Sequence, residues 1–109
     1  MLCAIRLKES IGMYAVIFRA EINELDEGYL EIAKRLRNLA VSKYGCIDFI
    51  SLTEGNKEIS ISCWKTKEEI EKWKKDPEHI QAQGLGKEKW YKSYTVQIAE
   101  VVIEHEWRT

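Results

Sequence analysis

The spacing of apolar positions changes several times along the chain, and each change predicts a different element. Residues 14–19 are a run of aromatic and β-branched side chains, which is typical of a strand with both faces buried. Across residues 27–44 the apolar positions recur three and four apart, which predicts a helix with one apolar stripe. Asp26 is a suitable N-cap for this helix, and Gly45 is a suitable residue to end it.

The middle of the chain predicts a β-hairpin. Residues 46–53 and 58–64 have strand patterns, and the glycine-containing segment 54–56 between them suits a tight turn. Side chains of the second run alternate between two faces of the sheet. One face carries Ile59, Ile61 and Cys63, and the other carries Ser60, Ser62 and Trp64.

Two short helices are predicted next. Thr66 and Glu69 have the spacing of a capping box, so a helix begins there and ends near Lys75. Pro77 is tolerated at a first helical position and predicts the start of the second helix.

The remaining segment predicts the end of that second helix and one more strand. Gly84 and Gly86 are expected to end the helix, and residues 87–91 to form a turn or a short helical piece. Residues 94–107 then read as a long final strand.

The element order β-α-β-β-α-β predicts a ferredoxin-like α+β fold with one antiparallel sheet. Helices cover only one face of such a sheet. We expect Trp64 and residues of the last strand to lie on the uncovered face, and an exposed apolar face usually marks an interface. The sequence therefore predicts a twofold-symmetric homodimer that closes into a dimeric α+β barrel. We expect residues 13–107 to form this domain and residues 1–12 to be an N-terminal arm.

Composition and charge exclude several classes of protein. The 109 residues suit one domain, and 17 basic and 18 acidic side chains are interleaved, with a net charge of −1. A nucleic-acid interface needs several basic residues on one surface, so nucleic acid is not an expected partner. No apolar run approaches the length of a membrane span, so a membrane is not expected either.

Cysteine and histidine usage argues against a metal site. The three cysteines, at positions 3, 46 and 63, include no closely spaced pair, which argues against a disulfide framework and structural zinc and favours the cytoplasm. The two histidines and the scattered carboxylates also lack the spacing of a catalytic metal site. No dinucleotide, phosphate-loop or nucleophile-elbow motif occurs.

The chain resembles the antibiotic biosynthesis monooxygenase family of dimeric α/β barrels, over about residues 13–107. The second half carries the more specific likeness, and its closest match is an uncharacterised bacterial branch of the family. The matching segments are 14–18, 45–49, 61–66, 70–73, 76–79, 82–83, 86–87, 90–91 and 93–94.

This resemblance implies a homodimer and an oxidative activity. Known enzymes of the family oxidise aromatic polyketides, quinol-like compounds or haem with molecular oxygen. Many need no bound flavin or metal, because a deprotonated, electron-rich substrate activates oxygen itself. Other members have no demonstrated chemistry.

Comparison with the haem-degrading members of the family argues against haem as the substrate. Trp73 matches their substrate-ruffling tryptophan. Ala82 stands where their haem-ligating histidine falls, and residues 14–20 lack their asparagine. Haem binding or degradation is therefore the third of three functional hypotheses.

His79 is the candidate base, because imidazole titrates near neutral pH and can deprotonate a phenol or quinol. A surface histidine in the first turn of a helix is the structural alternative. Flat apolar side chains with one polar tip suit an aromatic ligand, but they suit a core or an interface equally well. On this basis the candidate substrate-binding residues are Trp64, Trp73, Gln83, Trp90 and Tyr91.

Two functions are therefore the leading hypotheses. The first is a cofactor-independent monooxygenase acting on a small aromatic or quinol-like molecule. The alternative is a non-catalytic small-molecule-binding or stress-related protein on the same fold.

Overall fold

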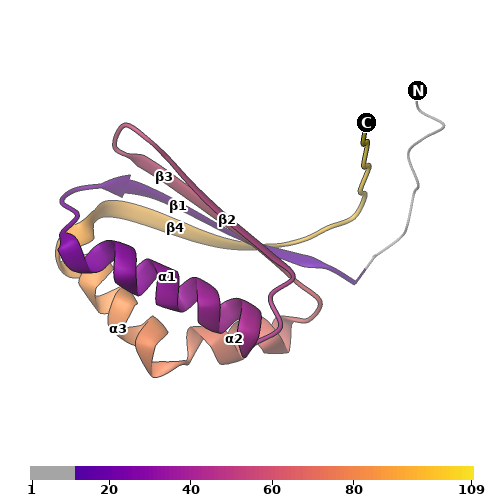
Figure 1. Cartoon of the computed structure of the whole chain (residues 1–109), viewed down its shortest axis with the longest axis horizontal. Helices are drawn as coiled ribbons and strands as arrows, with labels where there is room; N and C mark the ends of the chain where they lie inside the picture. Colours follow the sequence, from indigo (N-terminus) through magenta and orange to yellow (C-terminus); the bar gives the residue numbers. More distant parts are fainter. Residues whose placement is uncertain (1–11) are drawn as a thin grey trace.

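A computed structural model describes residues 12–109, so the predicted arm at 1–12 lies almost wholly outside the described residues. A single four-stranded antiparallel sheet has the strand order β2-β3-β1-β4. The helices lie together on one side of it (Figure 1). The predicted ferredoxin-like α+β fold is therefore confirmed.

The first half of the chain follows its apolar pattern closely. β1 (Tyr14–Ile22) leads to α1 (Glu27–Ser42), where the Asp26 side chain accepts hydrogen bonds from the first-turn amides as predicted. Gly45 has a φ of +90°, a left-handed conformation that glycine adopts without strain, and Glu69 fills the space where a Cβ would lie. The hairpin follows as β2 (Asp48–Glu54) and β3 (Lys57–Trp64).

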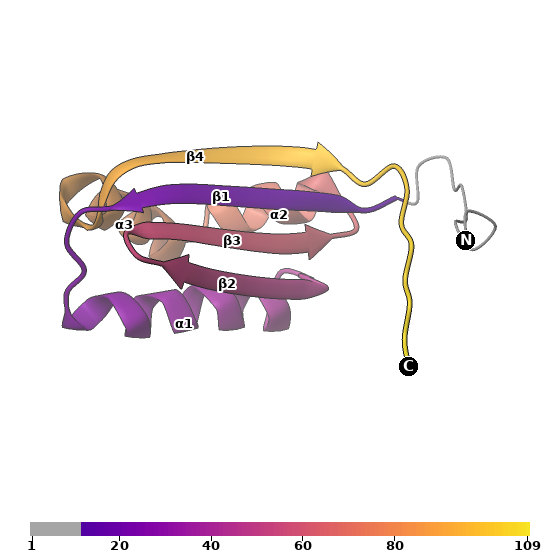
Figure 2. The same cartoon turned by 90° about the horizontal axis from the view of Figure 1, so that it is seen from above.

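In the second half, α2 (Lys67–Lys74) begins with the predicted capping box. α3 (Pro77–Leu85) runs through Gly84 and passes directly into a single π-helical turn, η2 (Gly86–Trp90). The expectation that Gly84 ends this helix is wrong. β4 (Tyr91–Glu100) then returns along the outer side of β1 (Figure 2).

The final strand is shorter than predicted. It begins at Tyr91 and ends at Glu100, whereas the pattern predicted a strand over 94–107. Glu100 pairs with Tyr14, the first residue of β1, and the Val101 amide donates to the Met13 carbonyl at 2.9 Å. Beyond that point β1 offers no partner, and the chain leaves the sheet (Figures 1 and 2).

The core lies between the sheet and the helices. It consists of Val16, Ala40, Cys46, Trp64, Ile70 and Trp73. Trp64 is fully buried there, so the prediction that it lies on the uncovered face is wrong. The alternation along β3 was correct, but the face covered by helices is the one that carries Ser60, Ser62 and Trp64.

The opposite face of the sheet, which we call the open face, carries the other alternating set. Ile50 and Leu52 of β2 lie opposite Ile61 and Ile59 of β3, and Ile17 of β1 lies opposite Ile61. Leu52 is 72% exposed and Ile59 is 46% exposed. Within residues 12–109, no helix has the length and apolarity needed to cross a membrane.

Candidate functional site

The first group of candidate residues lies where α2 and α3 meet the end of β3. The indole rings of Trp64 and Trp73 are 5.2 Å apart between centroids. Trp64 Nε1 donates to Ser62 Oγ at 2.8 Å, and Trp73 Nε1 donates to the Leu36 carbonyl at 3.2 Å. Both indole donors are therefore satisfied inside the protein, so these two rings form a rigid wall.

His79 lies against this wall in the first turn of α3. Its ring meets Trp73 edge-on, with centroids 4.4 Å apart. Burial is the main reason that the pKa of His79 lies below its usual value, because a buried imidazole favours its uncharged form. His79 is therefore neutral at physiological pH.

Gln83 follows His79 by one helical turn and holds its ring. The side-chain Nε2 of Gln83 and Nδ1 of His79 are 3.1 Å apart. With the amide nitrogen donating, neutral His79 carries its proton on Nε2 and presents a donor. With the amide reversed, Nδ1 donates to the amide oxygen and Nε2 is free to accept a proton. The orientation of the Gln83 amide thus determines whether His79 Nε2 donates or accepts a proton.

Asp76 fixes the start of α3 and hence the position of His79. Its carboxylate accepts a hydrogen bond from the Glu78 amide at 2.9 Å and another from the Tyr44 hydroxyl at 2.6 Å. Its role is accounted for by this helix cap.

A second group lies near the other end of the sheet, where Glu58 begins the helix-side row of β3. Glu58 is only 3% exposed. The Tyr91 hydroxyl donates to its Oε2 at 2.7 Å, and the Tyr29 hydroxyl donates to its Oε1. The pKa of Glu58 is raised, mainly by burial, although the Tyr91 hydrogen bond acts in the opposite sense.

Trp90 completes this second group. Its ring meets Tyr29 edge-on at 5.1 Å, and its Nε1 donates to Asp26 Oδ1 at 3.4 Å. Lys89 forms an ion pair with the same aspartate and holds its pKa below the usual range. The start of α1 is therefore tied to η2.

The structure divides the predicted site residues between these two groups. Trp64, Trp73, His79 and Gln83 lie together, and Trp90 and Tyr91 lie with Glu58. Glu58 and Trp64 are six positions apart along β3, which is roughly 20 Å along a strand. Sequence reasoning missed Glu58 and Tyr29. The sequence could have identified Glu58 by the alternation along β3, which places it on the same face as Ser60, Ser62 and Trp64.

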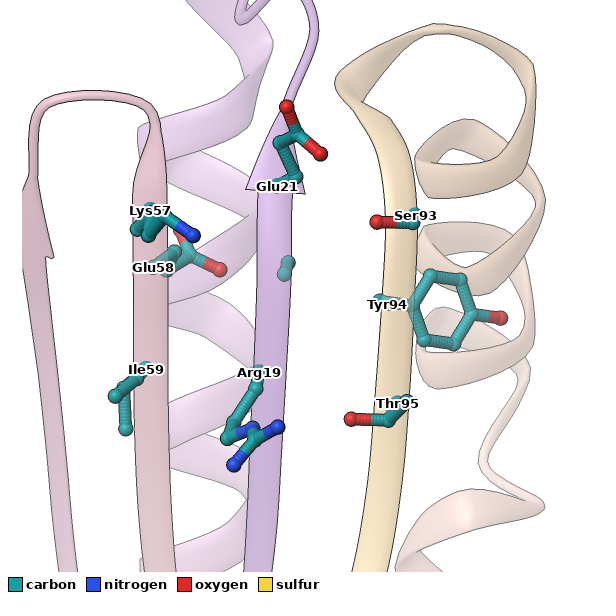
Figure 3. Close-up of a pocket in the computed structure, with 9 residues that line it drawn as sticks. Arg19, Glu21, Lys57, Glu58, Ile59, Ser93, Tyr94 and Thr95 are labelled. Carbon is teal, nitrogen blue, oxygen red and sulfur yellow. The ribbon is translucent and has the colours of Figure 1, made fainter.

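A shallow hollow lies on the open face, at the end of the sheet near the hairpin turn (Figure 3). It is formed by three adjacent strands. The side chains that line it from the open face are Arg19 and Glu21 from β1, Lys57 and Ile59 from β3, and Ser93 and Thr95 from β4. None of the predicted site residues lines it.

A metal site is not apparent in the described part of the chain. Over residues 12–109, no three side chains of His, Cys, Asp or Glu come together in a way that could hold an ion. Burial raises the pKa of both Cys46 and Cys63, which disfavours their thiolates.

The chain is similar in sequence to a known bacterial protein. No protein-family model matches the chain. The uncharacterised protein YqjZ of Bacillus subtilis is 37% identical over 89 residues, which cover 81% of this chain and 78% of YqjZ.

Solved structures share the fold at much lower identity. A putative antibiotic biosynthesis monooxygenase from Nitrosomonas europaea superposes with a TM-score of 0.72 at 13% identity, over 87% of this chain and 94% of the other. SnoaB, a cofactor-independent oxygenase from Streptomyces nogalater, gives 0.69 at 10% identity, over 83% and 93%. A dimeric protein of unknown function with a ferredoxin-like fold from Bacteroides fragilis gives 0.62 at 14%, over 84% and 99%. These likenesses establish the antibiotic biosynthesis monooxygenase fold.

Proposed function

Because the chain belongs to the family of Bacillus subtilis YqjZ and has the antibiotic biosynthesis monooxygenase fold, we propose that it is a cofactor-independent monooxygenase acting on a small aromatic or quinol-like molecule. The observation that carries this proposal is His79, a neutral and half-buried imidazole held by Gln83 against the Trp73 ring. An aromatic wall beside an uncharged base suits a flat substrate with an acidic hydroxyl.

The proposed chemistry begins with proton removal. His79 Nε2 takes a hydroxyl proton from the substrate when the Gln83 amide is reversed, so that Nδ1 donates to the amide oxygen. The resulting electron-rich anion supplies all the electrons that reduce molecular oxygen. One oxygen atom enters the product as a carbonyl, and the other leaves as water.

An oxygen electrode tests this function with 1,4-dihydroxynaphthalene as the quinol. We expect His79→Ala to lower the enzyme-dependent rate by roughly a hundredfold, the usual contribution of a general base. His105→Ala, a change at the other histidine, serves as the control and should keep the rate. Unchanged oxygen consumption in His79→Ala would remove His79 from the mechanism.

A second candidate is a non-catalytic small-molecule-binding protein on the same fold. The satisfied indole donors of Trp64 and Trp73 favour it, because rings fixed in this way also act simply as packing. Ligand binding without any oxygen consumption by the wild type would select this candidate.

We also propose that the open face binds a second copy of the chain. Its apolar centre includes Ile17, Ile50 and Ile59, and its charged end carries both Arg19 and Glu21. A twofold interface places each charge of one copy opposite a different residue of the other, so a surface with both signs can complement itself. The Bacteroides fragilis protein with this fold is described as dimeric.

A further inference from the structure

Glu58 is a buried carboxylate whose environment is unusual for a structural role. Among residues 12–109 the buried carboxylates are Glu58 and Asp76, and Asp76 caps a helix. Glu58 caps nothing, and no Lys or Arg in this part of the chain forms an ion pair with it. Its two oxygens each accept one phenolic hydroxyl instead. Burial raises the affinity of this carboxylate for a proton, although the Tyr91 hydrogen bond favours the anion.

The two tyrosines that contact Glu58 differ in their other neighbours. The Tyr29 ring packs against Trp90, at the docked start of α1. The Tyr91 ring packs edge-on against Phe18, with centroids 5.3 Å apart, and Phe18 stacks on Tyr94 at 5.5 Å. Tyr29 contacts Tyr91 itself, with ring centroids 6.5 Å apart. Of the two tyrosines, Tyr91 is the one whose ring contacts Phe18 and Tyr94.

These aromatic residues continue into a partly exposed apolar surface. Phe18 pairs with Val96 and Val16 pairs with Ile98, so Val96 and Ile98 lie on the same helix-side face as Phe18. Val96 is 44% exposed and Ile98 is 41% exposed, although both are apolar. A flat ligand lying on this surface would have Tyr91 at its border.

The π-helical turn η2 is a second, independent feature at the same place. It delivers Trp90 and then Tyr91 into β4. Turns of this kind are rare and occur frequently at functional sites, where they aim particular side chains.

We propose that Tyr91 and Glu58 form a proton relay that ionises the hydroxyl of a bound phenol or quinol. The hydroxyl proton of the ligand moves to Tyr91 Oη, while the phenolic proton of Tyr91 moves to Glu58 Oε2. The step leaves a bound phenolate and a neutral carboxyl group, and no electrons are transferred. This relay rests on the ligand class of the proposed function and is independent of His79. Tyr91 contacts the ligand, and Glu58 is the terminal proton acceptor.

The test uses 4-nitrophenol, whose phenolate is coloured, and needs no turnover. Binding is followed by quenching of tryptophan fluorescence, and the ionisation of the bound phenol by its absorbance across a pH series. In the wild type we expect the bound phenol to be about tenfold more acidic than the free phenol, a shift of about one pKa unit. Glu58→Gln and Tyr91→Phe should abolish this shift while nitrophenol still binds.

Tyr29→Phe is the matched control, since it also removes one hydroxyl from the same carboxylate. It should keep the shift to within about twofold. A loss in Tyr29→Phe as large as that in Tyr91→Phe, or an unchanged shift in Glu58→Gln, would overturn the relay alone. Absence of nitrophenol binding to the wild type would overturn the relay together with the proposed ligand class.

Discussion

Glu58 and His79 have pKa values shifted in opposite directions, although burial is the main cause for both. Burial disfavours the charged form, which is the deprotonated form of a glutamate and the protonated form of a histidine. The carboxylate therefore becomes a stronger proton acceptor, and the imidazole stays neutral. Burial thus favours the uncharged form of both side chains.

Glu58 should leave a signature in the pH dependence of stability. A raised pKa in the folded state gives stability that is present below the unfolded pKa and is lost as pH rises through the folded pKa. The free energy of unfolding of the wild type should therefore fall relative to Glu58→Gln above about pH 4.3, by at most about 1.4 kcal/mol per pH unit. Urea unfolding of both proteins across pH 4 to 8 measures the difference. A difference that does not change with pH would contradict the burial of an ionisable Glu58.

Sequence patterns located the first group of site residues better than the second. His79 and Gln83 are four apart, so a helix brings them together without further information. Glu58 stands beside a hairpin turn, where a charged side chain is normally solvated. Its burial depends on Tyr29 and Tyr91, which come from distant parts of the chain. Such a contact exists only after the helix and the last strand have packed.

At the scale of elements, alternation predicted which residues of β3 share a face but not which face the helices cover. Ile59 and Ile61 look more like core residues than Ser60 and Ser62 do. Which face the helices cover depends on the large side chain at the end of the row, Trp64, which packs with Trp73 of α2. The length of β4 also depended on its partner, because residues 101–107 have a strand pattern but lie beyond the start of β1.

Glycine substitutions can test the packing of η2 against Tyr91. A Cβ at Gly86 would lie 3.1 Å from Tyr91 Cδ2, whereas a Cβ at Gly84 would meet nothing within 4 Å. Gly86→Ala should lower the free energy of unfolding by about 1 kcal/mol through overpacking. Gly84→Ala should raise it by roughly 0.5–1 kcal/mol, because alanine is the better helix former. Thermal unfolding compares the two variants, and equal effects would argue against close packing of Tyr91 on Gly86.

At the scale of the whole molecule, both faces of the sheet are apolar, but the helices cover only one (Figure 1). A thin layer of helices and one sheet buries a limited core. A second copy on the open face would increase the apolar area that is buried. The assembly is thus expected to be more stable than the single chain, and its stability should depend on protein concentration.

A charge placed on the open face tests this assembly. Ile59→Lys puts a cation among apolar residues of the proposed interface, so the dimer should dissociate in sedimentation velocity experiments. Val41→Lys, at a similarly exposed position on α1, is the control and should remain dimeric. If Ile59→Lys sediments like the wild type, the open face is not the contact between copies.

The π-helical turn has one more consequence, which concerns length rather than composition. Successive residues of a helix are rotated by about 100°, so a single added or deleted residue re-aims everything that follows. Lys87 and Glu88 of η2 are exposed and, within residues 12–109, no side-chain hydrogen bond or ion pair holds them, so their identities are open to change. The number of residues in η2 is not open to change, because Trp90 and Tyr91 reach Tyr29 and Glu58 only with the present number. Homologues that keep this site should therefore vary freely at positions 87 and 88 while carrying no insertion or deletion between Gly86 and Tyr91.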